Sequence, residues 1–160
     1  MNPKKPFREI FKGLKPKAFV IPLPYFNPQR AQECLDCVGG CVSACPEHII
    51  IKEEGALPHL DFKERGCTFC GECAQVCAQE HAGVLEREHS SVIGAWALID
   101  FQTCLSYQGV VCFACKDTCP YNAISFEGMF FPHIHASCTG CGMCAPVCPS
   151  QAILFVERKT

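Results

Sequence analysis

Short apolar runs recur along the chain, and polar turns containing glycine separate several of them. The runs span 49–51, 57–62, 95–101, 123–126, 129–135 and 152–156. Their β-branched and aromatic residues predict strands. The first two runs flank the turn Lys52–Gly55, and the fourth and fifth flank Glu127–Gly128, so we expect two β-hairpins. The pattern predicts an α+β fold of small antiparallel sheets and short helical turns.

The N-terminal segment follows a different pattern, in which apolar side chains recur at helical spacing: Phe7, Ile10, Phe11 and Leu14. Basic residues lie between them and Pro6 suits a first helical turn, so we expect a short amphipathic helix over 6–15. Three interpretations are open: a docking helix for an acidic partner or for this protein's own acidic body, a weak contact with a membrane surface, or a frayed end with chance periodicity. We treat residues 1–29 as a basic N-terminal arm.

Cysteine usage narrows the class of protein, because 16 of the 160 residues are cysteine. Such a density indicates either a disulfide scaffold outside the cell or a metal protein inside it. Lys15, Pro16 and Lys17 interrupt any secretory signal, and Arg8 has no neighbouring arginine that would form a twin-arginine signal. No run approaches the roughly 18 apolar residues of a membrane span. We therefore expect a cytoplasmic protein with reduced thiols and no transmembrane segment.

The sixteen cysteines fall into four quartets, two in each half of the chain. The quartets are Cys34, Cys37, Cys41 and Cys45; Cys67, Cys70, Cys73 and Cys77; Cys104, Cys112, Cys115 and Cys119; and Cys138, Cys141, Cys144 and Cys148. The longest interval between quartets separates the second from the third, which suggests that the halves meet near 86–95. We divide the chain into the arm, a first domain at 30–88 and a second domain at 89–160.

The spacing within the quartets predicts [4Fe-4S] clusters. Cys-x2-Cys-x2-Cys supplies three thiolates from one loop, and in two-cluster ferredoxins the fourth cysteine ligates the other cluster. Structural zinc instead takes two pairs of ligands separated by a longer spacer. Four clusters follow, with ligand sets Cys34/Cys37/Cys41/Cys77, Cys67/Cys70/Cys73/Cys45, Cys104/Cys112/Cys115/Cys148 and Cys138/Cys141/Cys144/Cys119.

Two of the quartets have altered loops. The first has three residues, 38–40, where two are usual, and the third has seven, 105–111, between its first two cysteines. A looser loop is compatible with weaker binding, a different potential or a three-iron form. We expect the nearby aromatic residues Phe69, Tyr107 and Phe113 to shield the clusters from water.

Cluster binding would change the electrostatics, because metal ligation requires thiolates. The formal net charge of −2 counts the cysteines as neutral. Sixteen thiolates add sixteen negative charges and four cluster cores of about +2 each return eight, which leaves about −10. The basic arm opposes this acidic body. No nucleophile–base arrangement, dinucleotide motif or phosphate loop is present, so we expect neither independent catalysis nor a nucleic-acid partner.

The motifs resemble those of a known family. The run CLSYQGVVCFACKDTC (104–119), with its seven-residue gap, resembles the third motif of the NapF-type ferredoxins encoded with periplasmic nitrate reductases. The motifs CTFCGECAQVC (67–77) and CTGCGMCAPVCPSQAI (138–153) are similar to that family's second and fourth. The likeness covers about 30–156. NapG-type proteins are similar too, but they carry a twin-arginine signal.

The resemblance implies two tandem bacterial-type 2[4Fe-4S] ferredoxin domains in a cytoplasmic accessory protein. It further implies contact with the nitrate reductase catalytic subunit before export and a role in its maturation, through assembly or redox chemistry of that subunit's own [4Fe-4S] centre. The alternative is a soluble electron-transfer ferredoxin that links a cytoplasmic donor to an oxidoreductase. The family usually has arginine pairs near the N-terminus, whereas this chain reads PKKPFREIFKGLKPK.

Overall fold

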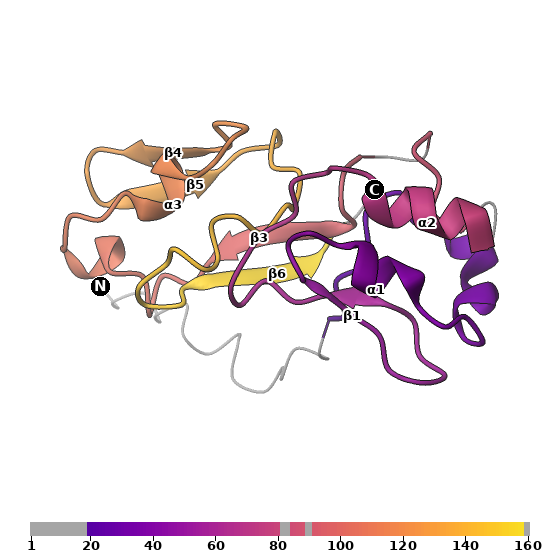
Figure 1. Cartoon of the computed structure of the whole chain (residues 1–160). Helices are drawn as coiled ribbons and strands as arrows, with labels where there is room; N and C mark the ends of the chain where they lie inside the picture. Colours follow the sequence, from indigo (N-terminus) through magenta and orange to yellow (C-terminus); the bar gives the residue numbers. More distant parts are fainter. Residues whose placement is uncertain (1–18, 81–83, 89–90, 159–160) are drawn as a thin grey trace, which may run out of the picture.

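The computed structural model describes residues 19–80, 84–88 and 91–158, which form short helices and three two-stranded antiparallel sheets (Figure 1). The predicted α+β class is confirmed. The helix expected over 6–15 lies outside the described residues. Within the described ranges, no helix is long and apolar enough to cross a membrane.

The first half, residues 19–88, contains two 3₁₀ or α-helical turns, a hairpin and one longer helix. In chain order these are η2 (Pro28–Cys34), α1 (Gly40–Ala44), β1 (Ile50–Ile51), β2 (His59–Leu60) and α2 (Glu72–Glu80). Ile50 pairs with Leu60 and Ile51 with His59, which confirms the first predicted hairpin. Helix α1 packs against α2.

The second half, residues 91–158, repeats this arrangement with longer strands. Its elements are β3 (Ala95–Ile99), η3 (Ser106–Gln108), α3 (Ala114–Asp117), β4 (Ile124–Glu127), β5 (Phe131–Ile134) and β6 (Ile153–Glu157). Strands β4 and β5 form the second predicted hairpin. Strands β3 and β6, expected separately, pair with each other from Ala95↔Glu157 to Ile99↔Ile153.

In each half, the segment at the start of the half pairs with the segment at its end. In the second half these segments are β3 and β6, whereas in the first half they are reduced to the bridge Phe26↔Leu85. Two hydrogen bonds support that bridge, from Asn27 N to the Val84 carbonyl at 2.9 Å and from Glu86 N to the Tyr25 carbonyl at 3.0 Å. Residues 19–27, which we assigned to the arm, thus pack on the first half.

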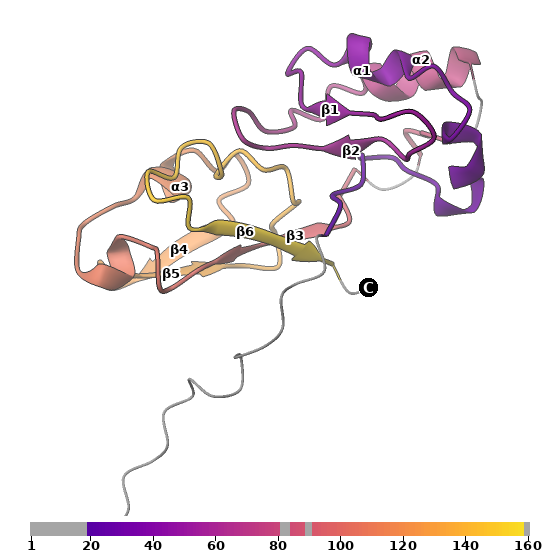
Figure 2. The same cartoon turned by 90° about the horizontal axis from the view of Figure 1, so that it is seen from below.

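The two halves lie side by side and share a junction (Figure 2). Leu23, Leu60 and Phe62 of the first half belong to the same buried cluster as Ile93 and Ala95. The rings of Phe62 and Phe155 are 5.1 Å apart across the junction. This packing orients one cysteine loop of each half toward the other.

Candidate metal centres

The structure contains four similar hollows, and each is lined by four cysteines. Every set combines three cysteines of one quartet with the last cysteine of the partner quartet. We call them site 1 (Cys34, Cys37, Cys41, Cys77), site 2 (Cys45, Cys67, Cys70, Cys73), site 3 (Cys119, Cys138, Cys141, Cys144) and site 4 (Cys104, Cys112, Cys115, Cys148). The four sets are those that crossed ligation predicts, and no cysteine is left outside them.

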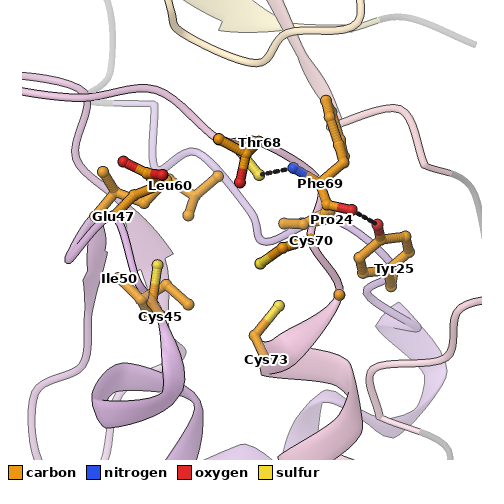
Figure 3. A pocket seen from close by; sticks show the side chains of 13 residues that line it. Pro24, Tyr25, Cys45, Glu47, Ile50, Leu60, Thr68, Phe69, Cys70 and Cys73 are labelled. Carbon is orange, nitrogen blue, oxygen red and sulfur yellow. Dashed lines mark hydrogen bonds between the residues drawn. The ribbon is translucent and has the colours of Figure 1, made fainter.

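Site 2 shows how the crossing arises (Figure 3). Helix α1 ends at Ala44, and Cys45 takes an extended conformation before Pro46, so its side chain faces Cys70 and Cys73 across the hollow. The loop of Cys67 wraps around the opposite side. Its turn requires positive φ at two residues, 56° at Phe69 and 79° at Gly71. These dihedrals bring the loop thiols to one side of the hollow, which a regular helix or strand would not do.

The hollows fit a polynuclear body better than a single ion. Each encloses about 330 to 360 Å³ of space outside the protein atoms, counting the part open to solvent. Among the described residues, no three His, Cys, Asp or Glu side chains converge closely enough to hold one metal ion. No disulfide joins any two of these cysteines. A [4Fe-4S] core held by four thiolates matches such a donor set.

Backbone amides already point at several of the sulfurs. The N–H groups of Gly39, Phe69, Ala123 and Ala152 donate to the sulfurs of Cys37, Cys67, Cys119 and Cys148 at 3.2 to 3.4 Å. One such bond occurs in each site. Because they stabilise negative charge on sulfur, these amides favour the thiolates that a cluster requires.

Burial acts in the opposite direction on the metal-free thiols. Together with the charge of neighbouring cysteines, it raises the pKa of Cys41, Cys67 and Cys115 to about 11 and that of Cys73 and Cys144 to about 12. A protonated thiol is a poor ligand, so iron must displace these protons when it binds. The positive charge of the iron would offset the cost of five buried thiolates.

The extra residue of the first quartet has a structural explanation. Gly39 begins α1 with φ of 83°, and a Cβ on Gly40 would lie 2.8 Å from Val76 Cγ1. Gly39 therefore supplies the left-handed residue before the helix, and Gly40 lets α1 pack closely on α2, which carries Cys73 and Cys77. The longer loop leaves all three of its cysteines in site 1.

Of the three aromatic residues expected beside the clusters, one lines a site. Phe69 lines site 2, but Tyr107 packs against Phe131 with ring centroids 5.7 Å apart. Phe113 contacts the ring of Phe126, and Phe126 lines site 4.

Several other residues line the sites although no motif in the sequence pointed to them. Tyr25 lines site 2 and donates to the Phe69 carbonyl at 3.0 Å, and Tyr121 lines site 3. Lys52 and Glu80 line site 1. These residues lie outside the cysteine motifs, so only the tertiary packing places them there.

The four sites follow one another in series. Cys41 of site 1 and Cys73 of site 2 are close enough to interact electrostatically, as are Cys115 of site 4 and Cys144 of site 3. Across the junction, the backbone N–H of Cys67 donates to the Cys141 carbonyl at 2.7 Å. Sites 2 and 3 therefore form the inner pair and sites 1 and 4 the outer ones.

Comparisons with known proteins agree with this donor chemistry. The 4Fe-4S dicluster domain matches residues 24–81, and the LdpA Fe-S cluster-binding domain matches residues 112–159. The ferredoxin-type protein NapF of Escherichia coli K12 is 36% identical over 128 residues, which cover 75% of this chain and 73% of that protein. The chain belongs to the NapF-type ferredoxin family.

Other ferredoxin-type proteins are similar to this chain over a smaller share of their own length. The ferredoxin-type protein NapG of Haemophilus influenzae is 32% identical over 80% of this chain and 55% of its own length. The methylamine utilization ferredoxin-type protein MauM of Paracoccus denitrificans is 34% identical over 72% of this chain and 59% of its own length. This NapF-type chain is therefore a 4Fe-4S protein of two ferredoxin-like halves.

Proposed function

We propose that this NapF-type ferredoxin acts in the cytoplasm, where it assists maturation of the periplasmic nitrate reductase catalytic subunit before export. The similarity to NapF over three quarters of the chain carries the proposal. Maturation would consist of assembling or reducing the [4Fe-4S] centre of that subunit. No independent catalysis is part of the proposal.

We assign one [4Fe-4S] cluster to each of sites 1 to 4, with the sixteen cysteines as ligands. When bound, such clusters accept and release single electrons. The chain contributes the thiolates, the amide donors beside them and the apolar walls that limit water. We also retain the division into an arm at 1–29 and domains at 30–88 and 89–160. The repeated plan of the two halves supports the two domains, whereas residues 19–27 of the arm pack on the first of them.

A second function, electron transfer between a cytoplasmic donor and an oxidoreductase, is favoured by the serial order of the sites. The hydrogen bond from Cys67 to Cys141 joins the two inner sites through the backbone. A carrier needs such continuity, whereas a maturation factor needs only a complex with its client and one cluster that it can release or use.

The decisive experiment uses this protein loaded with isotope-labelled iron and the cofactor-free nitrate reductase catalytic subunit. We expect the two to co-purify and labelled iron or electrons to reach the subunit. A matched pair of variants, Cys37→Ser in altered site 1 and Cys70→Ser in regular site 2, shows which cluster is used. Failure of the wild-type protein to form any complex would contradict maturation and leave electron transfer as the function.

A further inference from the structure

Two buried side-chain atoms that can donate hydrogen bonds lack a partner, and both lie beside site 3. Within the described part of the chain, Thr139 Oγ1 and Arg158 Nε are the buried side-chain nitrogen or oxygen atoms without a hydrogen bond. Thr139 directly follows Cys138 and lines site 3. Buried donors are normally satisfied, so two of them at one place call for an explanation.

Three contacts hold the Arg158 side chain beside Cys138, the first cysteine of the site 3 loop. Its Nη2 donates a short hydrogen bond to the Cys138 carbonyl and a longer one, 3.5 Å, to the Ala95 carbonyl. The guanidinium lies over the Trp96 ring at 4.7 Å from the centroid. None of the ion pairs between described residues involves Arg158. Its positive charge, which has no carboxylate partner among the described residues, therefore lies next to Cys138.

Thr139 directs its hydroxyl toward the same site. Its side chain lines the hollow, and the buried hydroxyl has no hydrogen-bond partner there. A cluster in site 3 would bring sulfur within this neighbourhood and supply an acceptor. The donor is thus buried, and a cluster sulfur beside it would satisfy it.

Site 2 offers a natural comparison, because its loop has the same cysteine spacing as the loop of site 3. Thr68 corresponds to Thr139 in the repeat, but its side chain is exposed. Arg87 donates from an exposed position to the Cys70 carbonyl at 3.3 Å, where water screens its charge. Site 3 therefore differs from its repeat partner in the burial of both groups.

We infer that Arg158 and Thr139 are positioning residues that raise the reduction potential of the cluster in site 3. On reduction, one electron from the neighbouring reduced cluster adds one negative charge to the site 3 cluster and oxidises the donor cluster. A part-buried guanidinium and a buried O–H donor would stabilise that added charge. Electrons would therefore occupy site 3 more readily than they would without these two side chains.

The test is a redox titration of the purified, cluster-loaded protein followed by electron paramagnetic resonance. We expect Thr139→Val and Arg158→Gln to lower the same one of the four midpoint potentials. Arg158→Lys keeps the positive charge and should leave that potential closer to wild type. The matched controls Thr68→Val and Arg65→Gln, at an exposed threonine and an exposed arginine, should leave that midpoint unchanged.

Retention of all iron with no shifted midpoint, or shifts of different clusters in the two variants, would overturn the inference. Thr139→Val replaces the hydroxyl with a methyl group of similar volume. If Arg158→Gln loses iron, the midpoint potentials of Thr139→Val alone therefore test the inference. The inference rests on the clusters assigned above, but the measurement needs no partner protein. Its outcome is therefore separate from that of the co-purification experiment.

Discussion

Single glycines determine how closely the two halves approach. Gly142 has φ of 77°, and a Cβ there would lie 2.2 Å from Phe62 Cγ. Gly66 is equally restricted, since its Cβ would lie 2.5 Å from the Met143 nitrogen. Both residues flank cysteines of the inner sites. Glycine is needed here because backbone and ring approach each other, a requirement that the cysteine motifs do not reveal.

Gly142→Ala should weaken the junction strongly. The added methyl group meets Phe62, and the left-handed backbone adds strain, so we expect about 2 to 5 kcal/mol of lost stability. Anaerobic thermal unfolding, monitored by cluster absorbance, measures the loss. Gly128→Ala is the matched control, because φ is 62° there but no atom lies within 4 Å of the added Cβ. That variant should lose only about 1 to 2 kcal/mol, and equal losses would refute the packing explanation.

At the scale of elements, the seven-residue interval of the third quartet is an ordered loop. Residues 106–108 form η3, and Gly109 ends it with φ of 82°. Ser106, which is 1% exposed, donates through Oγ to the Cys112 carbonyl at 2.8 Å. The long gap thus returns the chain to the correct place for Cys112 to line site 4. The sequence did not predict that this loop is ordered, because the hydrogen bond from Ser106 to Cys112 joins residues six positions apart.

Ser106→Ala tests whether this bond holds site 4 together. Removal of the donor leaves the part-buried Cys112 carbonyl without that partner, at a cost of roughly 1 to 3 kcal/mol. We expect one of the four clusters to lose iron faster to a chelator, with the other three unaffected. Ser43→Ala is the matched control, since Ser43 makes the same kind of bond to the Gly40 carbonyl at 3.0 Å but at an exposed position. Uniform iron loss from all clusters would argue against a local role.

At the scale of the whole molecule, little regular structure surrounds the four hollows. The sheets have two strands each, and isolated two-stranded sheets are at best marginally stable in water. Cysteine side chains also belong to both groups of buried hydrophobic residues that form the core. Folding and cluster binding should therefore be one process.

Removal of all iron by a chelator under reducing conditions should abolish most of the secondary structure. Without iron, the hollows lose their contents while burial disfavours the thiolates at the same positions. Far-UV circular dichroism before and after chelation measures the change, and a chelator saturated with iron serves as the control. Survival of the native spectrum would show that the apolar contacts suffice alone.

The sequence by itself determined the features that depend on local spacing. Cysteine intervals predicted the quartets, and apolar runs beside turn residues predicted both hairpins and the strands at 95–101 and 152–156. These predictions succeed because a loop or hairpin is specified by residues near one another in the chain. The grouping of the sixteen cysteines followed from the known crossing rule, which the hollows match in geometry.

Only the tertiary structure decided the relations between distant segments. It paired β3 with β6, packed residues 19–27 on the first half and joined Cys67 to Cys141. It also placed Arg158 beside Cys138, twenty residues away in the chain. Such contacts leave no periodic trace in a sequence, because they depend on how whole elements pack. The differences between the four sites therefore arise from packing, while their shared ligand chemistry is written in the spacing of the cysteines.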